Sequence, residues 1–175
     1  LFMGTLDAHL IAIDARNGQP LWNTTVADSK LAYSLTMAPL VIKDLVIVGS
    51  AIGDRLMFKN DPPGVVRAYN ARTGRNIWDF YVVPQPPEFG HDTWGNNSWA
   101  GTGHANAWAA MAVDTERGLL YIPTSTPSND FYGGRRPGAN LFAESLVCLD
   151  AATGQRKWHF QAVHHGLWDY DFPAP

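Results

Sequence analysis

The sequence contains little charge and almost no cysteine. Charged residues account for 17% of its 175 residues and the formal net charge is −3, so nothing indicates a polyphosphate or nucleic-acid partner. The single cysteine, Cys148, excludes an internal disulfide and leaves the redox compartment undetermined. Because Cys148 lies within an apolar run, we expect a buried, unreactive thiol. No apolar run approaches the length of a membrane-spanning helix, and no stretch shows convincing helical periodicity.

Tryptophan, glycine and proline are abundant, with 7, 16 and 12 residues respectively. This composition is typical of many short strands joined by tight turns around aromatic anchors. The first residues, Leu1 to Thr5, have the pattern of the middle of a strand, and Pro175 falls inside a motif. We therefore expect a fragment of a longer protein, in which the missing signal peptide carries no meaning.

One short segment recurs three times without gaps. The copies are AIDARNGQPLW, AYNARTGRNIW and CLDAATGQRKW, which begin at Ala12, Ala68 and Cys148. Each contains Asp or Asn followed by Ala, then Gly and Trp at fixed spacing. This pattern predicts a hairpin in which the Asp or Asn side chain caps the turn, the glycine takes a positive φ, and the next strand carries the tryptophan inward.

Two further pairs of strands are predicted, in residues 38–50 and 109–125, where short turns split apolar runs. Together with the hairpins they form four-stranded antiparallel units with one aromatic signature each, which are typical of β-propeller blades. The prediction is thus an all-β fragment of about two to three blades. An incomplete propeller exposes sheet edges, so we expect the chain alone to be inactive.

The predicted division of the chain is as follows. The end of one blade occupies residues 1–33, and full blades occupy 34–83 and 107–165, with the next connection at 166–175. The insertion at 84–106 is rich in Gly, Asn and Trp and is longer than a blade connection needs. Long loops on a rigid scaffold often carry function, although this loop could also simply cap the propeller face.

Three features together resemble one family: the hairpin signature, the loop TGHANAWAAMAVDTERGLLYIPTS and the tail VHHGLWDYD. They are similar to quinoprotein dehydrogenases, which are eight-bladed propellers that bind pyrroloquinoline quinone (PQQ) and a metal ion. The resemblance covers essentially the whole chain and favours the membrane-bound glucose dehydrogenase type. It implies PQQ- and metal-dependent oxidation of a sugar or alcohol hydroxyl, with hydride transfer to the quinone C5. It also implies ubiquinone or a cytochrome c as electron acceptor and a periplasmic location, with any inner-membrane anchor outside this chain.

The resemblance assigns three residues around the cofactor. Trp108 matches the indole that forms the floor under PQQ, Asp169 matches the catalytic base, and Thr36 matches a position that hydrogen-bonds the cofactor edge. A flat cofactor needs an aromatic face to stack on, and a carboxylate beside a cation stays deprotonated and can accept a proton. From the residues alone, Trp108 could be a core tryptophan, Asp169 a turn cap after Trp168, and Thr36 the start of a strand.

The resemblance also implies a metal shell of hard oxygen ligands from Asp54, Thr126, Asp169 and Asp171. Asp54 falls where methanol dehydrogenases place a glutamate, and Thr126 where many relatives have asparagine, for which nearby Asn129 could substitute. On a strand, Asp169 and Asp171 would face the same ion. We expect Ca²⁺ or Mg²⁺; a lanthanide is the alternative, because such an Asp pair accompanies lanthanide use in the methanol dehydrogenase branch.

Other positions near the tail have less defined roles. Gly166 stands where relatives often have Asp after the two histidines, and this departure could open space for a different substrate. Trp168 is expected to position Asp169. The pair Arg135 and Arg136 could bind an anion, but a solvated loop is the preferred interpretation.

Two other kinds of protein remain open. One is a non-catalytic PQQ-like propeller of the outer-membrane assembly or sensor kind, which would have no reason to keep Trp108 together with Asp169. The other is a degenerate enzyme that retains the fold and only part of the site. The substrate class is equally open among aldoses, polyols, cyclic acids and simple alcohols.

Overall fold

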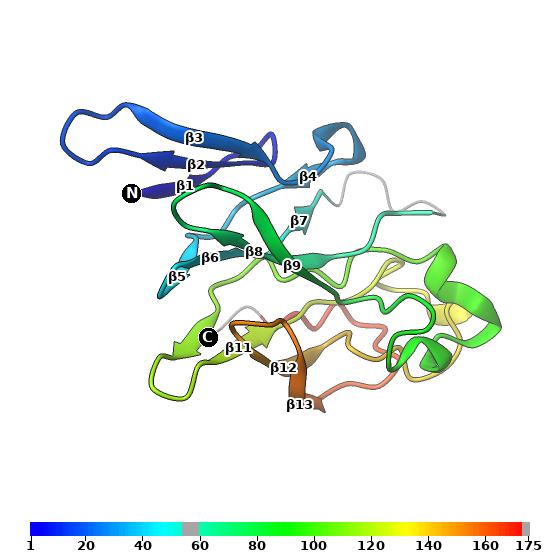
Figure 1. Ribbon diagram of the computed structural model, residues 1–175. Coiled ribbons are helices and arrows are strands. Elements are labelled where there is room, and N and C mark those ends of the chain that lie inside the picture. The colour runs from blue at the N-terminus through cyan, green and yellow to red at the C-terminus, as the bar shows by residue number, and fades with distance from the viewer. Residues whose placement is uncertain (54–59, 173–175) are drawn as a thin grey trace.

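The computed structural model describes residues 1–53 and 60–172. Short antiparallel sheets follow one another in chain order (Figure 1). The first has three strands, β1 (Phe2–Gly4), β2 (His9–Ile13) and β3 (Pro20–Thr25). The second has four strands, β5 (Leu40–Ile42), β6 (Leu45–Val48), β8 (Val65–Asn70) and β9 (Asn76–Tyr81). The third also has four, β10 (Ala112–Asp114), β11 (Leu119–Pro123), β12 (Ser145–Asp150) and β13 (Arg156–Gln161).

The remaining elements are small. The strands β4 (Tyr33–Ser34) and β7 (Ala51–Ile52) form a two-stranded sheet. In the described residues the helices are single 3₁₀ turns or short 3₁₀ segments, namely η1 (Ser29–Leu31), η3 (His91–Thr93), η4 (Gly95–Ala100) and η5 (Gly133–Arg135). None of the described helices is long and apolar enough to cross a membrane.

The three sequence repeats form the predicted hairpins, β2–β3, β8–β9 and β12–β13. In the second copy, Asn70 Oδ1 accepts hydrogen bonds from the backbone N–H groups of Arg72 and Thr73, both at 3.0 Å. The turn glycines Gly18, Gly74 and Gly154 have φ values of 75°, 70° and 71°. These contacts confirm the cap and the positive φ that the repeat predicts.

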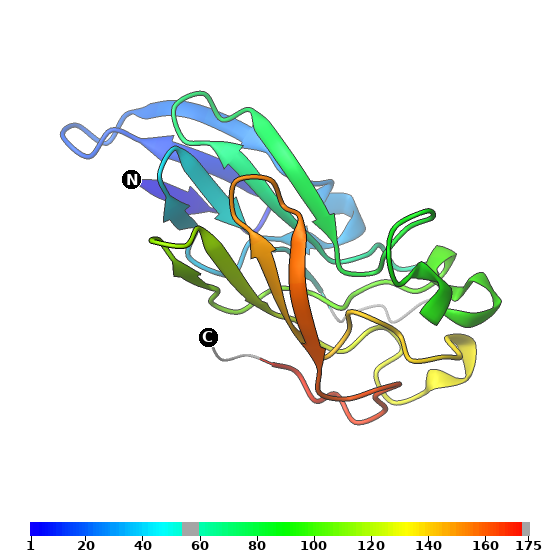
Figure 2. The same ribbon diagram turned by 60° about the horizontal axis from the view of Figure 1, so that its bottom comes forward.

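Tryptophans of the repeats connect consecutive sheets. The indole N–H of Trp22 donates to the carbonyl of Ala71, and that of Trp78 donates to the carbonyl of Ala151, each at 3.1 Å. The same rings cover the turn glycine of the next hairpin, so a Cβ at Gly154 would lie 2.7 Å from Trp78. Trp22 and Trp78 therefore each hold their own sheet against the turn of the following one, and the sheets stack in series (Figures 1 and 2). Trp158 of the third copy exposes 41% of its surface, so the predicted inward placement was wrong for that tryptophan.

The apolar core lies between these stacked sheets. Ile47, Val66, Leu120 and Val147, from the second and third sheets, are fully buried in one cluster. The continuous run Val46–Val48 is buried throughout, because β6 has packed sheets on both sides. Cys148 is also fully buried, as the sequence predicted.

The long loops gather at one end of the molecule. The segments around η3, η4 and η5 lie side by side there (Figures 1 and 2). The indole N–H of buried Trp94 donates to the carbonyl of Leu141, and Gly95 N–H donates to the carbonyl of Pro137 at 2.6 Å. The insertion thus packs on the loop that precedes β12, and its last residues lead directly into the site described next.

Candidate functional site

A cavity of about 430 Å³ opens where five separate segments of the chain meet. They are the residues around β4, those around β7, the segment 104–108, the loop 125–130 and the tail 169–171. Most of the predicted site residues line this cavity, namely Thr36, Trp108, Thr126, Asp169 and Asp171. The predicted ligand Asp54 lies outside the described residues, although its neighbour Gly53 lines the cavity.

Trp108 is held at the cavity wall through both its backbone and its indole. The Thr36 hydroxyl donates to the carbonyl of Trp108 at 3.2 Å, and the indole N–H of Trp108 donates to Asp171 Oδ2 at 3.1 Å. Trp108 exposes 37% of its surface, whereas the core tryptophan Trp94 exposes 1%. Trp108 is therefore not a core residue, and part of its ring is available to a flat ligand.

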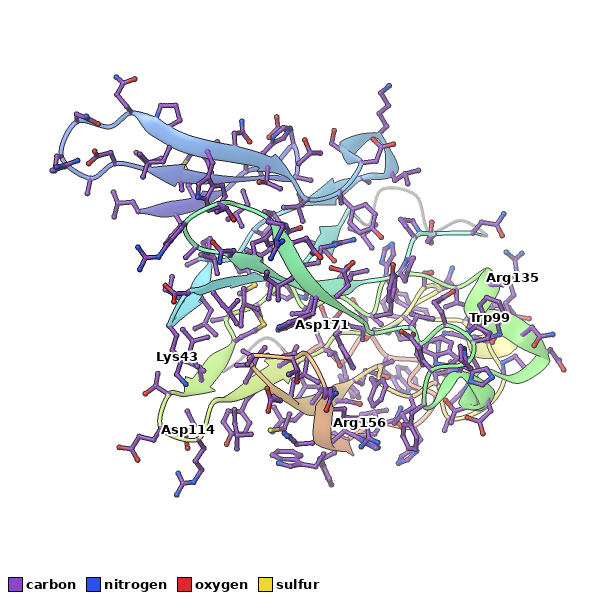
Figure 3. All side chains as sticks on the ribbon, in the orientation of Figure 1. Lys43, Trp99, Asp114, Arg135, Arg156 and Asp171 are labelled. Carbon is purple, nitrogen blue, oxygen red and sulfur yellow. The ribbon has the colours of Figure 1, made fainter. Side chains whose placement is uncertain are left out.

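Asp171 joins the tail to two other walls of the cavity. Besides the indole of Trp108, it accepts the backbone N–H of Thr126 at Oδ1, at 2.9 Å. A carboxylate has about four lone-pair sites, so both oxygens keep acceptor capacity after these bonds. Figure 3 shows Asp171 in the middle of the molecule, between the second and third sheets.

Asp169 lines the same cavity in a left-handed backbone conformation, with φ of 56°. Such a φ is uncommon for residues other than glycine, although aspartate is several-fold enriched there. The tail from Ala162 to Phe172 contains no strand. The prediction that Asp169 and Asp171 lie on one strand and for that reason face the same way was therefore wrong. An irregular turn brings both carboxylates to the cavity instead.

Several cavity residues were not predicted. Asn106 is 5% exposed, and its Oδ1 has no hydrogen-bond partner among the described residues. His104 and Asp130 also line the cavity and are buried. Asn129, which was considered as a substitute ligand, does not line the cavity; its carbonyl and its Oδ1 accept hydrogen bonds from Arg136 and from the backbone of Phe131. The sequence offers one signal for Asn106 as a cavity residue, namely its position two residues before Trp108.

A carboxylate stands behind the cavity at Glu144, which is completely buried. Its Oε1 accepts the hydroxyl of Thr126 at 3.4 Å. Burial raises the pKa of Glu144 to about 7, against the opposing attraction of Arg136. A Cβ at Gly166 would overlap the Glu144 carboxylate. The prediction that Gly166 opens space for a substrate is therefore wrong, because the Glu144 carboxylate fills that space.

Arg136 is also completely buried, so the interpretation of both arginines as a solvated loop was wrong for this residue. Arg135 is exposed at the outer edge of the loops (Figure 3). Burial lowers the pKa of Arg136, and three neighbouring acceptors satisfy two of its guanidinium nitrogens. These acceptors are Asn140 Oδ1 at 2.9 Å, the carbonyl of Asn129 at 3.0 Å and the carbonyl of Gly166 at 2.6 Å.

Trp168 does not anchor the tail in this structure, since it exposes 70% of its surface. The expected positioning of Asp169 by Trp168 is replaced by contacts on either side of it. Asp171 fixes the tail after Asp169, and the Gly166 carbonyl fixes it before Asp169 through Arg136.

The donor set of the cavity suits a hard cation more than a soft one. Oxygen is offered by Asn106, Thr126, Asp169 and Asp171, and hard cations prefer carboxylate and amide oxygens. Within residues 1–53 and 60–172, no group of three or more His, Cys, Asp or Glu side chains could hold a metal. A cation in this cavity therefore needs amide or hydroxyl oxygens beside the carboxylates, and the partner-free Oδ1 of Asn106 is such a donor.

Comparison with known proteins gives consistent matches over the whole chain. Residues 1–175 match the family described as "PQQ: Glucose/ethanol/alcohol dehydrogenase, beta-propeller domain". Quinohemoprotein alcohol dehydrogenase ADH IIB of Pseudomonas putida is 35% identical over 97% of this chain and 26% of its own length. The glycerol dehydrogenase large subunit of Gluconobacter oxydans is 36% identical over 96% of this chain and 24% of its own.

Solved structures agree. The quinohemoprotein alcohol dehydrogenase ADHIIG of Pseudomonas putida HK5 superposes with a TM-score of 0.89 at 35% identity, over 99% of this chain and 27% of that one. A europium-containing methanol dehydrogenase gives a TM-score of 0.86 at 30% identity, over 99% of this chain and 32% of that one. The chain thus spans about a quarter of the length of the curated relatives it matches.

Proposed function

The chain belongs to the PQQ-dependent glucose, ethanol and alcohol dehydrogenase family of β-propellers, and we propose that it supplies one side of the active site of such a dehydrogenase. The substrate class is a sugar or alcohol with an oxidisable hydroxyl. The predicted β-propeller fold class is confirmed by the family match and the solved structures. The division into blades and the count of eight blades in the complete protein stay predictions.

The observation that carries the proposal is the meeting of Trp108, Asp169 and Asp171 at one cavity. Trp108 is more than 60 positions from the two aspartates in sequence, and its hydrogen bond to Asp171 joins the two segments directly. A structural scaffold gains nothing from an exposed tryptophan face beside two carboxylates. When bound there, PQQ supplies the hydride acceptor and a hard cation supplies a Lewis acid beside it.

Trp108 would hold the cofactor by stacking, and the bond from its indole to Asp171 restricts the rotation of the ring. Thr36 acts on the same wall, because its hydroxyl is bonded to the Trp108 backbone. We therefore assign to Thr36 the support of the tryptophan in addition to the predicted contact with the cofactor edge.

Asp169 would serve as the general base that takes the proton of the substrate hydroxyl on its carboxylate. The base must be ionised before the reaction, and both solvent access and a neighbouring cation favour the ionised form. Asp169 is exposed in the described structure, so it can reach a substrate that enters the cavity.

The metal would be held by Asn106, Thr126, Asp169 and Asp171, with Asp54 as a further predicted ligand. We propose Ca²⁺, with Mg²⁺ as a second choice, because these donors are hard oxygens of mixed charge. A lanthanide is the alternative that the two carboxylates allow, and one structural neighbour is a europium-containing methanol dehydrogenase. The electron acceptor we propose is ubiquinone or a cytochrome c, and the location we propose is the periplasm.

Titration of the complete protein with PQQ tests this proposal without knowledge of the substrate. Quenching of tryptophan fluorescence is followed with and without Ca²⁺. We expect saturable, Ca²⁺-dependent quenching that Trp108→Ala abolishes. The control is Trp99→Phe, a partly buried tryptophan outside the cavity, which should leave the affinity unchanged. Absence of quenching with Ca²⁺, Mg²⁺ and a lanthanide would favour a non-catalytic propeller.

A further inference from the structure

Two opposite charges are completely buried behind the cavity, and the proposed chemistry uses neither. Arg136 and Glu144 each have 0% exposure, and each acts electrostatically on the other. Removing a charge from water is strongly unfavourable unless a partner and hydrogen bonds compensate for it. Such a pair is weak evidence for stability alone, and its contacts point to a role in positioning.

Arg136 connects three segments of the loops and the tail, beside the bonds that His165 makes to residues 138–140. Its guanidinium bonds the carbonyls of Asn129 and Gly166 and the side chain of Asn140. Asn129 follows the cavity residue Thr126 by three positions, and Gly166 precedes Asp169 by three. The rigid, planar fork of arginine fixes the relative placement of its acceptors, which the single ammonium of lysine cannot do.

Glu144, the residue directly before β12, contacts the same loop and the same tail. It accepts the hydroxyl of Thr126, and its carboxylate occupies the place that a side chain at position 166 would take. With the Glu144 carboxylate in this place, position 166 has no room for a side chain. Glu144 and Asp130 both act electrostatically on Arg136, Glu144 more strongly, and we expect an aspartate at position 166 to take the place of the Glu144 carboxylate where residue 144 is shortened.

We propose that Arg136 and Glu144 are positioning residues that hold Thr126 and the tail carrying Asp169 in their reactive placement. This inference rests on the proposed function, because it concerns the placement of the proposed base. It implies that Gly166 and Glu144 act as a matched pair: the glycine leaves room for the Glu144 carboxyl group, which acts electrostatically on Arg136.

The first test uses the complete protein without cofactor. Hydrogen exchange is measured for the peptide covering residues 163–171 and, as an internal reference, for a peptide covering β6 and β8. We expect Arg136→Lys and Glu144→Gln to speed exchange in the tail peptide and to leave the reference peptide unchanged. Arg135→Lys, at the exposed neighbouring position, is the matched control and should change neither. Equal protection of the tail in wild type and in both variants would overturn the proposal.

The second test uses the PQQ- and Ca²⁺-loaded protein with ethanol, glycerol and glucose as substrates and an artificial electron acceptor. Misplacement of a catalytic group by about 1 Å can cost on the order of 10²-fold in rate. We expect Arg136→Lys and Glu144→Gln to lower kcat by at least about tenfold, with KM and PQQ affinity changing by less than about threefold.

Relocating the carboxylate separates positioning from general stability. Glu144→Ala should lower kcat, and adding Gly166→Asp to it should restore most of the loss. Gly166→Asp alone should be the most damaging variant, since its side chain would overlap the Glu144 carboxylate. Failure of the double variant to recover kcat, while its melting temperature recovers, would overturn the proposal.

The outcome also separates this inference from the proposed function. Wild-type protein that neither binds PQQ nor oxidises any of the three substrates contradicts both. Wild-type protein that does both, together with full activity in folded Arg136→Lys and Glu144→Gln, contradicts the positioning role alone.

Discussion

Substitution of Asp171 tests how the proposed cofactor floor is held. Asp171 accepts two N–H groups, from the indole of Trp108 at 3.1 Å and from the backbone of Thr126 at 2.9 Å. Asp171→Asn keeps the shape but offers only one acceptor oxygen, so one of the two donors must face an amide nitrogen. Asp171→Ala removes both bonds.

The magnitude follows from the worth of one hydrogen bond at a partly exposed position. A net contribution of about 1 kcal/mol corresponds to roughly a fivefold change in an equilibrium constant. If the bond to Asp171 restricts the Trp108 ring, PQQ binding should weaken by about fivefold in Asp171→Asn and by somewhat more in Asp171→Ala.

The assay is the fluorescence titration with PQQ at saturating Ca²⁺. The high Ca²⁺ concentration compensates for weaker metal binding in the variants, so that the measured change reports the loss of the tryptophan contact. Asp44→Asn, an exposed aspartate on the turn between β5 and β6, serves as the control. A PQQ affinity in both Asp171 variants equal to that of wild type would refute the claim that Asp171 organises the floor.

Three further predictions concern the scaffold. Gly118→Ala should destabilise the protein by about 1–2 kcal/mol, because its φ of 67° strains any residue with a Cβ. Gly154→Ala should cost about 1–3 kcal/mol more, because its Cβ would also meet the Trp78 ring. Equal losses of unfolding free energy for the two variants in denaturant unfolding would contradict this prediction. Trp78→Phe leaves the Ala151 carbonyl without its indole donor and should cost about 1–3 kcal/mol in the same assay, while exposed Trp168→Phe should stay within about 0.5 kcal/mol. Burial raises the pKa of Tyr33 to about 12, so the folded state holds its proton more tightly than the unfolded state. Stability should therefore fall as pH rises from about 10 to 12, and Tyr33→Phe should flatten that slope in alkaline unfolding.

The hairpins could be predicted from sequence because their determinants are local. An Asp or Asn, a glycine four positions later and a tryptophan after it encode the cap, the positive φ and the docking ring within eleven residues. The contact of each tryptophan with the turn of the next sheet was not readable from one hairpin alone. It joins residues about 50 to 70 positions apart.

Resemblance to the family identified most of the cavity residues, whereas the sequence did not reveal the buried Arg136 and Glu144 behind the cavity. Arg136 is next to the exposed Arg135 in a loop rich in glycine, so nothing local distinguishes a buried arginine from a solvated one. Its burial results from packing against segments around positions 129, 140 and 166. The predicted open space at Gly166 was wrong because the contact is also distant in sequence. The carboxylate that fills this space belongs to Glu144, 22 positions earlier.

The role of Asp169 as the general base is tested by the turnover of the PQQ- and Ca²⁺-loaded Asp169→Asn variant of the complete protein, with the best substrate of the wild type. Asparagine keeps the shape of the side chain and cannot accept the proton. We expect kcat to fall by about 10²- to 10⁴-fold, the range typical of a general base, with PQQ still bound. A variant that binds PQQ and turns over at the wild-type rate would contradict the assignment of Asp169 as the base.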